Sequence, residues 1–250
     1  MIKSNQDKEI LSYIKKISKA NINDICAEFK ISESTSKRVL ARLEAAGYIS
    51  RYKGGAVALV ADDTDFCRRL DDNRGPKDMI ARKAAENITE NAVVILLGGT
   101  TVSMMCPYLC GMKLTVITNS LPVLDQLKGQ PGIILVMLGG IYNHEEREFF
   151  GNVTSVGLRL MHADSLFMSC LGFSSGLGFM TNHIDSIDFY KLCMKNADKT
   201  YILADSSKSE RSDIAIVAAA READCLITDS ALSRDKIAEF SAKGVDVIVT

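Results

Sequence analysis

The 250-residue sequence predicts two domains: a small helical domain that ends in a β-hairpin, and a larger α/β domain with a largely parallel sheet. Helical patterns and a glycine-containing hairpin fill residues 1–60, whereas apolar runs alternate with helical segments over residues 77–250. Residues 61–76 are charged and lack an apolar period, so we expect them to form a linker. Charge follows the same division, because residues 1–60 carry 11 Lys and Arg against 6 Asp and Glu, and residues 61–250 carry 19 against 25.

The N-terminal domain should contain three helices. Apolar residues at helical spacing predict a helix over residues 7–20 and a second, two-turn helix over residues 22–29. A third helix should begin at Ser32 or Ser34, which can cap it, and end before Gly47. A basic turn at Lys53-Gly54-Gly55 then predicts a hairpin. A short helix, a tight turn and a longer helix form a helix-turn-helix, with the hairpin as its wing.

Basic and hydroxyl side chains lie where such a motif meets the DNA major groove. Hydroxyls can approach base edges and phosphates, and Lys and Arg can neutralise backbone charge. A basic helix beside a hairpin is often only a solvated surface, but the order of three helices, a glycine stop and a basic turn favours binding to double-stranded operator DNA. The predicted DNA-binding residues are Ser34, Thr35, Ser36, Lys37, Arg38, Arg42, Arg51, Lys53 and Gly54.

The larger domain shows seven apolar runs typical of buried parallel strands. We expect strands at residues 92–97, 114–118, 132–138, 164–171, 199–204, 223–228 and 245–250. Helices should separate them at residues 78–88, 102–109, 121–127, 154–162, 185–197 and 231–243. In such sheets ligands collect beyond the carboxyl ends of the strands.

Glycine, hydroxyl and amide residues follow these strands, and DSSK follows the fifth. Each motif alone is ordinary turn chemistry, but together they are typical of a phosphate site, with Lys208 as a cation and the start of the helix near Val102 as a dipole. The predicted effector-binding residues are Gly98, Gly99, Thr100, Thr101, Thr118, Asn119, Ser120, Gly139, Gly140, Gly172, Asp205 and Lys208. Neither G-x-G-x-x-G nor a Walker A loop is present, which argues against nucleotides.

The N-terminal motifs resemble the winged helix-turn-helix of the DeoR family of sugar-operon regulators, which reads S-x-x-T-x-R-R-D-L, L-E-x-x-G and R-x-x-G-G-A. The matching residues are Ser32, Thr35, Lys37-Arg38, Leu40, Leu43-Glu44, Gly47, Arg51 and Gly54-Gly55-Ala56. The chain departs from that pattern at Lys37 and Val39, which stand where the family has Arg and Asp. A Lys lacks the planar fork of an Arg, so the operator sequence cannot be taken over from the family.

The C-terminal motifs resemble the sensor domain of the same family, which has the sugar-phosphate isomerase and CoA-transferase fold. The matching residues are Gly99-Thr100-Thr101, Val116 to Leu121, Leu138-Gly139-Gly140 with Gly151, Ala163-Asp164 with Phe167, Asp205 to Lys208 and Ile227-Thr228-Asp229. The resemblance implies a homodimeric or homotetrameric regulator, most often a repressor, whose DNA affinity changes when a phosphorylated sugar binds.

Leu97 stands where the family's first sensor motif has an acidic residue. A carboxylate that could bind a sugar hydroxyl or act as a base is therefore missing, so we expect no enzymatic activity and no catalytic residue. Two alternatives stay open: an aldose-ketose phosphate isomerase with a DNA-binding extension, and a DNA-binding protein whose C-terminal domain only oligomerises.

The sequence gives no sign of a cofactor or metal. Its seven Cys form no C-x-x-C pair, and we expect reduced thiols in a cytoplasmic protein without a membrane partner. His144, Glu145, Glu146 and Glu148 could form a metal cluster, but a solvated loop is the expected structure. His162 and His183 are expected to be surface or hydrogen-bonded histidines, and Asp164 and Asp229 to cap turns or helices.

Overall fold

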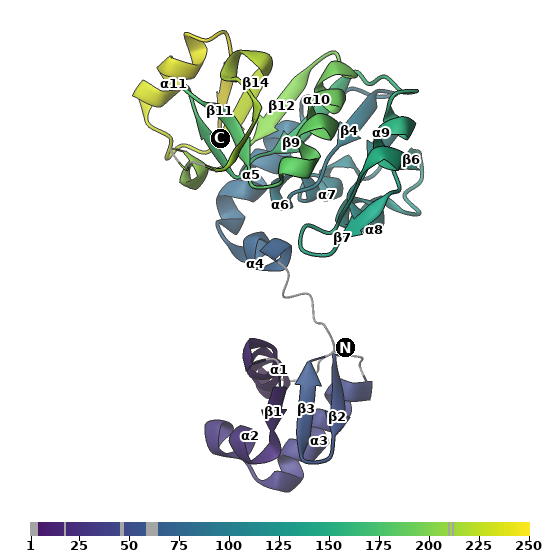
Figure 1. Cartoon of the computed structure of the whole chain (residues 1–250), viewed down its shortest axis with the longest axis vertical. Coiled ribbons are helices and arrows are strands. Elements are labelled where there is room, and N and C mark those ends of the chain that lie inside the picture. Colours follow the sequence, from purple (N-terminus) through teal and green to yellow (C-terminus); the bar gives the residue numbers. More distant parts are fainter. Residues whose placement is uncertain (1–4, 18, 46–47, 59–64, 210, 212) are drawn as a thin grey trace. The chain divides into compact units, whose positions relative to one another are not determined.

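The computed structural model describes residues 5–17, 19–45, 48–58, 65–209, 211 and 213–250. The chain divides into two compact units, Met1–Cys67 and Arg68–Thr250, here called the N-terminal and C-terminal units. Figure 1 shows the elements of each unit. The boundaries 1–60, 61–76 and 77–250 remain a proposal for where the functional domains begin and end.

The N-terminal unit contains the three predicted helices and the hairpin. Its helices are α1 (Asn5–Ile17), α2 (Ile22–Phe29) and α3 (Glu33–Ala45). Strands β2 (Ile49–Tyr52) and β3 (Gly55–Ala58) form the wing. Residues 19 and 20, predicted as the end of the first helix, belong instead to strand β1 (Lys19–Asn21), which pairs with β3. The expected helix stop at Gly47 lies outside the described residues. Buried apolar side chains from all three helices and β2 form one core.

The expected linker contains regular structure. Helix α4 (Asp65–Asp71) lies within residues 61–76, and α5 (Arg74–Ala85) begins before residue 77. Residues 61–64 lie outside the described part. The lack of an apolar period did not reveal these helices, because polar side chains hold this segment in place. Arg69 pairs with Glu146, and Asn73 donates a hydrogen bond to Asp205; both partners are distant in sequence.

The C-terminal unit is built on a seven-stranded parallel sheet, as predicted. Its order is β15-β14-β12-β9-β4-β5-β6, and every neighbouring pair is parallel. The strands are β4 (Val93–Leu96), β5 (Leu114–Thr118), β6 (Ile133–Met137), β9 (Ser165–Ser169), β12 (Thr200–Leu203), β14 (Cys225–Thr228) and β15 (Asp246–Val249). The carboxyl ends of β12, β9 and β4, three neighbours, therefore meet at one edge.

Helices cover both faces of this sheet (Figure 1). One face packs on α5, α6 (Thr100–Ser103), α7 (Cys106–Leu109) and α8 (Leu121–Leu127). The other packs on α9 (Asn152–Leu158), α10 (Ile187–Lys195) and α11 (Arg234–Ser241). Where one helix was predicted over residues 102–109 there are two short ones, because Pro107 in the first turn of α7 starts a new helix. The four-residue α6 provides little of the expected dipole.

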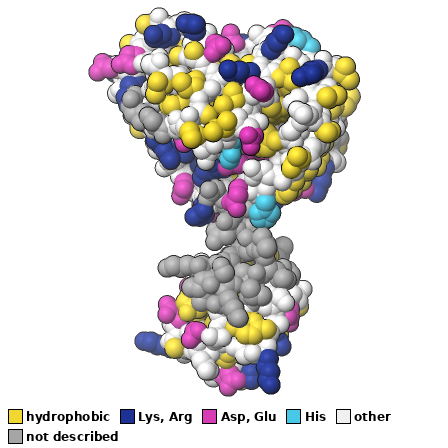
Figure 2. Space-filling view, in the orientation of Figure 1, with side chains coloured by type: hydrophobic (Ala, Val, Ile, Leu, Met, Phe, Trp, Pro, Cys, Tyr) yellow, Lys and Arg dark blue, Asp and Glu magenta, His cyan; other side chains and the backbone are white. Residues whose placement is uncertain are grey.

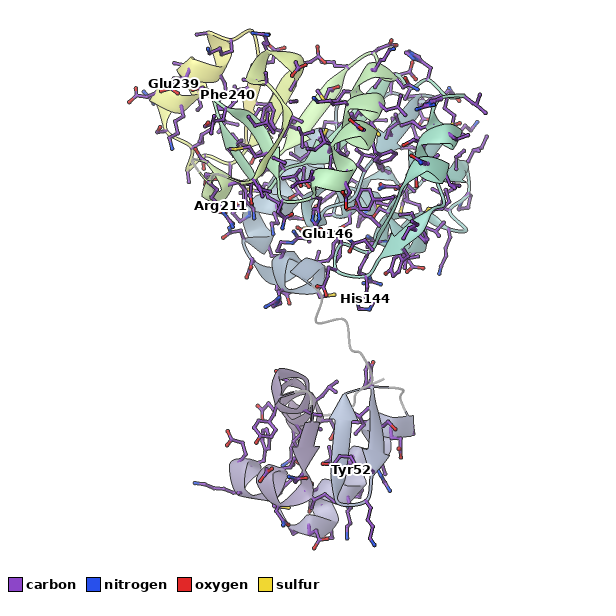
Figure 3. All side chains as sticks on the ribbon, in the orientation of Figure 1. Tyr52, His144, Glu146, Arg211, Glu239 and Phe240 are labelled. Atoms are coloured by element: carbon purple, nitrogen blue, oxygen red, sulfur yellow. The ribbon has the colours of Figure 1, made fainter. Side chains whose placement is uncertain are left out.

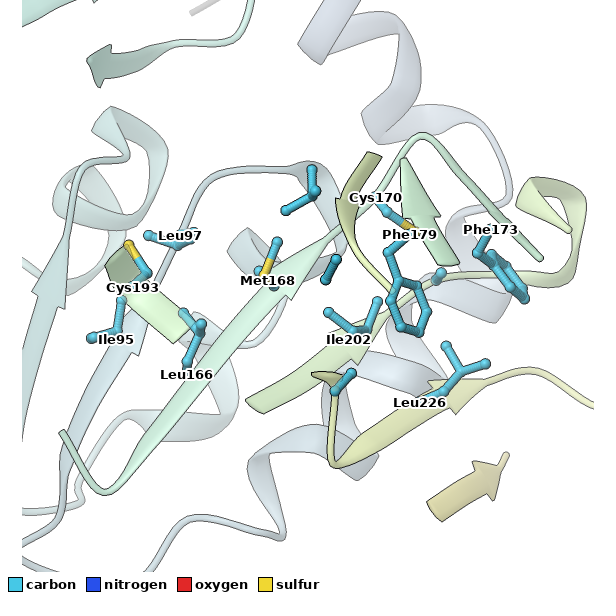
Figure 4. Packing of buried hydrophobic residues seen from close by; sticks show 14 of the residues in the cluster. Ile95, Leu97, Leu166, Met168, Cys170, Phe173, Phe179, Cys193, Ile202 and Leu226 are labelled. Atoms are coloured by element: carbon cyan, nitrogen blue, oxygen red, sulfur yellow. The ribbon is translucent and has the colours of Figure 1, made fainter. Parts of the chain in front are cut away.

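Two small antiparallel sheets complete the C-terminal unit. Strands β7 (Ile141–Asn143) and β8 (Glu148–Phe150) form a hairpin, and β10 (Gly172–Ser174), β11 (Gly178–Thr181) and β13 (Ala215–Ala218) form a three-stranded sheet. Short 3-10 helices lie at Ile184–Ser186, Ser206–Lys208 and Ala220–Glu222. Phe173 and Phe179 of the small sheet enter the core on the α10 side, together with Leu97 (Figure 4). None of the described helices is long and apolar enough to cross a membrane.

Candidate functional site

The start of α3 exposes part of the predicted DNA-binding surface. Ser34, Lys37 and Arg38 are exposed there. The Ser32 hydroxyl accepts a hydrogen bond from the Thr35 main-chain N–H at 3.2 Å and so caps the helix. Lys37 pairs with Glu33 one turn away at 2.6 Å, and both side chains are exposed. Such a pair is weak, so a DNA phosphate can compete for the Lys37 ammonium.

Two predicted DNA-binding residues of α3 make contacts within the N-terminal unit. Ser36 is 0% exposed, because it lies on the same helix face as Val39, Leu40 and Leu43. The Arg42 guanidinium donates to both carboxylate oxygens of Asp7 on α1, at 3.1 and 2.6 Å. The Asp7 side chain is 3% exposed, so this ion pair joins α1 to α3. Burial removes Ser36 from the set of proposed DNA contacts, whereas Arg42, whose side chain is 45% exposed, stays a prediction.

The wing keeps its predicted exposed residues. Arg51, Lys53 and Gly54 are exposed, and Gly54 has a φ of +101°, which favours glycine at this turn. The Gly54 carbonyl accepts from the Ile22 N–H at 2.9 Å, which ties the wing to the start of α2. Figure 2 shows Lys and Arg side chains on the visible surface of the N-terminal unit.

A cavity lies at the carboxyl ends of β4, β9 and β12, and we call it the strand-end cavity. It brings together six of the predicted effector-binding residues: Gly98, Gly99, Thr100, Thr101, Asp205 and Lys208. Its wall also contains Arg69, Lys77, Leu97, Glu146, Glu148, Met168, Ser169, Cys170, Leu171, Thr181, His183, Tyr190, Leu203, Ala204 and Val217. Gly99 has a φ of +106°, and a Cβ there would lie 2.0 Å from the Ser169 hydroxyl, so only glycine fits.

Three cationic side chains line this cavity. Burial lowers the pKa of Lys77 and of Lys208, against the attraction of Asp205. Lys77 donates to the main-chain oxygen of Arg69, and Arg69 pairs with Glu146. Asp205 accepts from the Asn73 amide at 3.0 Å and caps the turn at Ser207, so its carboxylate is held in place. Partly desolvated ammonium groups beside glycine backbone suit an oxyanion such as a phosphate.

Two buried carboxyls face these cations, although a solvated loop was expected. Glu146 lies 3.0 Å from the His183 ring; burial opposes ionisation, but hydrogen bonds from His183 and Arg69 lower the pKa of Glu146 overall. Glu148 is 3% exposed, and burial, followed by the charge of Glu146, raises its pKa to about 8. Figure 3 shows Glu146 and His144, and His144 is exposed, so the expectation of a solvated loop holds only for part of the segment.

Stability should depend on pH through Glu148. An acid whose pKa is about 8 when folded and near 4.5 when unfolded binds an extra proton only in the folded state between those values, so stability falls as pH rises from about 4.5 to 8. We expect Glu148→Gln, which keeps the neutral shape, to flatten this part of the profile. Thermal unfolding from pH 5 to 9 measures it, with Glu145→Gln as control; equal slopes in all three proteins would contradict the expectation.

The other predicted effector-binding residues lie outside the cavity wall. Thr118, Asn119 and Ser120 are fully buried, and Asn119 holds β8, because its amide donates to Glu148 at 3.3 Å and to the Phe149 carbonyl at 3.0 Å. The glycines serve close packing: a Cβ on Gly140 or Gly172 would meet the carbonyl oxygens of Phe150 and Arg211 at 2.5 and 2.1 Å. The Gly139 carbonyl accepts from the Thr154 hydroxyl at 2.9 Å.

Sequence reasoning missed the cavity residues that come from outside the strand ends: Arg69, Lys77, Glu146, Glu148, His183 and Tyr190. Lys77 offered a signal, since it shares the inward face of its helix with Ile80 and Ala84. Asp229 has the capping role expected for it, as its carboxylate accepts from the Ser206 and Ala231 N–H groups. Among the residues described, no group of three or more His, Cys, Asp or Glu could hold a metal ion.

Each of the two units matches a known protein domain family. Residues 7–61 match the DeoR-like helix-turn-helix domain, and residues 72–230 match the DeoR C terminal sensor domain. The chain is 28% identical over 249 residues to the HTH-type transcriptional regulator YulB of Bacillus subtilis, covering 99% of this chain and 96% of that protein. It is 30% identical over 247 residues to a lactose phosphotransferase system repressor of Lactococcus lactis, covering 96% of each.

A further relative is named as an activator and not as a repressor. The L-fucose operon activator of Haemophilus influenzae is 26% identical over 229 residues, covering 91% of this chain and 92% of that protein. Among solved structures, ribose 5-phosphate isomerase A of Methanocaldococcus jannaschii aligns with a TM-score of 0.41 at 17% identity over 55% of each chain, too distant to carry a functional argument. The two domain matches and the full-length relatives show that the chain belongs to the DeoR family of DNA-binding transcriptional regulators.

Proposed function

We propose that this regulator controls a carbohydrate-metabolism operon and that a phosphorylated sugar, bound in the strand-end cavity, changes its affinity for operator DNA. The cavity carries the proposal, because it places Lys77, Lys208 and Arg69 beside the glycine pair Gly98-Gly99. The names of the lactose and L-fucose relatives support a sugar operon. A ligand changes DNA affinity only if it binds the DNA-competent and DNA-incompetent states unequally.

Operator binding with and without effector tests this function. The full-length protein is titrated with promoter DNA from its own genomic neighbourhood, in the presence of each member of a panel of sugar and polyol phosphates. We propose repression relieved by ligand, so one phosphate should weaken DNA binding at least fivefold. Relatives include repressors and an activator, and tighter binding with the phosphate would reverse the proposed sign. No response to any phosphate would favour a C-terminal unit that only oligomerises.

The isomerase alternative requires an ionised base in the strand-end cavity. Leu97 supplies none, and Glu148, with a pKa of about 8, is mostly protonated at neutral pH. Glu146 is ionised but paired with Arg69 and His183, and the Asp205 carboxylate already accepts hydrogen bonds from the Asn73 amide and the Ser207 N–H. We therefore propose that the protein is not an enzyme. Conversion of a pentose or hexose phosphate into its ketose or aldose isomer by the purified protein would overturn this.

Exposed hydrophobic side chains support self-association. Ile141, Val153 and Leu160 are 77%, 73% and 86% exposed, on β7 and along and just after α9. Figure 2 shows hydrophobic side chains gathered on the visible face of the C-terminal unit. Large apolar patches on soluble proteins commonly mark interfaces, so we propose a homodimer or homotetramer. A monomeric mass by light scattering at micromolar concentration would contradict it.

Arg38 and Arg42 provide a matched pair of tests for the recognition helix. We expect Arg38→Ala to weaken operator binding about tenfold and to reduce the slope of log K against log salt by about 0.9, since one phosphate contact is lost. Arg42→Ala should lower the melting temperature of the N-terminal unit, because the buried Asp7 carboxylate loses its ion pair with Arg42. Fluorescence anisotropy at several salt concentrations and calorimetry separate the effects; an unchanged slope in Arg38→Ala would remove Arg38 from the interface.

A further inference from the structure

A carboxyl group occupies the end of β4 although the strand-end residue is apolar. Leu97 is 1% exposed, and its side chain packs in the core near Met168 and Cys193 (Figure 4). The carboxyl comes instead from Glu148 on β8, 51 positions later in the chain. Its Oε1 lies 1.4 Å from where a Cβ on Gly98 would be, so the carboxyl rests directly on the Gly98 backbone.

We propose that Glu148 is a specificity-determining residue of this sensor, which recognises a hydroxyl group of a polyhydroxylated phosphate ester whose phosphate is bound at Lys77 and Lys208. The inference rests on the proposed function and deepens it, because it assigns separate residues to the two chemical parts of the effector.

The position of Glu148 is fixed by the end of β5. The Phe149 N–H donates to the Asn119 carbonyl at 2.9 Å, and the Leu121 N–H donates to the Arg147 carbonyl at 2.9 Å. The Asn119 amide bonds both the Phe149 carbonyl and the Glu148 carboxyl, at 3.0 and 3.3 Å. Main-chain bonds on either side of Glu148 therefore hold its side chain over Gly98, as a selective contact requires.

The surroundings of Glu148 keep its carboxyl neutral. Tyr190 and Cys193 of α10 are close enough to interact electrostatically with Glu148, and burial, followed by the charge of Glu146, raises the pKa of Glu148. The opposing positive charge of Arg69 is engaged by Glu146, which also contacts His183. A neutral carboxyl can donate one hydrogen bond and accept another, which matches a hydroxyl, and it does not repel a phosphate.

The two carboxyls of the β7–β8 hairpin therefore have different chemistry. Glu146 is ionised and its oxygens contact Arg69 and His183. Glu148 has one weak bond to Asn119 and a neutral carboxyl that lines the cavity. Of these two carboxyls, Glu148 is the one that combines a donor with spare acceptor capacity next to the glycine backbone, so the selective contact is assigned to it.

Calorimetric titration of the full-length protein tests this assignment. The probes are inorganic phosphate, which reports on the cations alone, and the sugar phosphates of the panel. Glu148→Ala should weaken the tightest sugar phosphate about tenfold or more and leave inorganic phosphate within twofold. Glu148→Gln, which keeps a donor and an acceptor, should recover at least a third of the lost affinity. Glu145→Ala, an exposed carboxylate in the same hairpin, is the control and should change neither.

A pH series adds a readout that a purely structural role would not move. Sugar-phosphate affinity of the wild type should fall as pH rises past about 8, where Glu148 ionises, and that of Glu148→Gln should fall less. Equal loss of both probes in Glu148→Ala, or no loss, would overturn the assignment. If the wild type binds inorganic phosphate but none of the sugar phosphates, the assignment of Glu148 is also overturned, whereas the phosphate site at Lys77 and Lys208 is retained. If the wild type binds neither probe, the proposed sensing function itself fails.

Discussion

Leu97→Asp is expected to lower the free energy of unfolding of the C-terminal unit by about 3 kcal/mol or more. The substitution removes a buried leucine side chain, which alone costs about 2–5 kcal/mol. It also places a further acid in the wall of the cavity that contains Glu148, whose pKa of about 8 already reflects burial and the charge of Glu146. The new carboxyl should share that raised pKa, so the loss of stability should grow as pH rises.

Two further substitutions separate the contributions at position 97. Leu97→Met conserves volume and polarity and should cost less than about 1.5 kcal/mol. Leu97→Asn is polar without being ionisable, so its destabilisation should not change between pH 6 and 9. Calorimetric unfolding of the three variants gives the comparison. A melting temperature of Leu97→Asp equal to that of the wild type would show that the site tolerates an acid and that packing is not the reason for leucine there.

Lys208→Met should raise the dissociation constant for the effector about 10- to 150-fold. A hydrogen bond to a charged group contributes about 1.5–3 kcal/mol, and Lys208 is a partly desolvated ammonium in the cavity wall. Methionine keeps most of the aliphatic length, so packing is largely conserved. Calorimetric titration with inorganic phosphate and with the tightest sugar phosphate measures the change.

The matched control is Lys83→Met on α5. The Lys83 side chain is 43% exposed, pairs with Glu86 at 2.7 Å and does not line the strand-end cavity. Its substitution should leave both dissociation constants within twofold. If Lys208→Met bound both probes as tightly as the wild type, the phosphate would have to be held elsewhere, with Lys77 and Arg69 as the next residues to substitute.

The fold could be predicted from the sequence where a local hydrophobic pattern is compatible with only one kind of secondary structure. The apolar runs of the central strands are buried on both faces of the sheet, the edge strands β6 and β15 are partly exposed, and all seven runs became strands of the parallel sheet. The sequence did not predict the three-stranded antiparallel sheet, because β11 pairs with β13 more than 30 residues later and neither strand is long enough to show alternation. Only tertiary contacts specify such a pairing.

Some residues of the candidate sites could likewise be predicted from the sequence, and others could not. Glycines and hydroxyls directly after β4, and the lysine after β12, could be predicted because parallel strands end at a common edge. Glu146 and Glu148 could not, since a polar segment is normally solvated and only the packing of the hairpin buries them. Ser36 could have been excluded as a DNA contact from the sequence, because its spacing to Val39, Leu40 and Leu43 places it on the buried face of α3.

The ion pair between Arg69 and Glu146 means that the strand-end cavity supplies its own counter-charges. A phosphate that approaches Arg69 competes with the Glu146 carboxylate, which is already paired with Arg69. The contribution of Arg69 to phosphate affinity is therefore the difference between the Arg69–phosphate and Arg69–Glu146 interactions. Arg69 belongs to α4, which directly follows residues 59–64 in the chain. Such an exchange of partners changes what holds α4, and under the proposed function thermodynamic reciprocity requires that operator DNA change effector affinity by the same factor as the effector changes operator affinity.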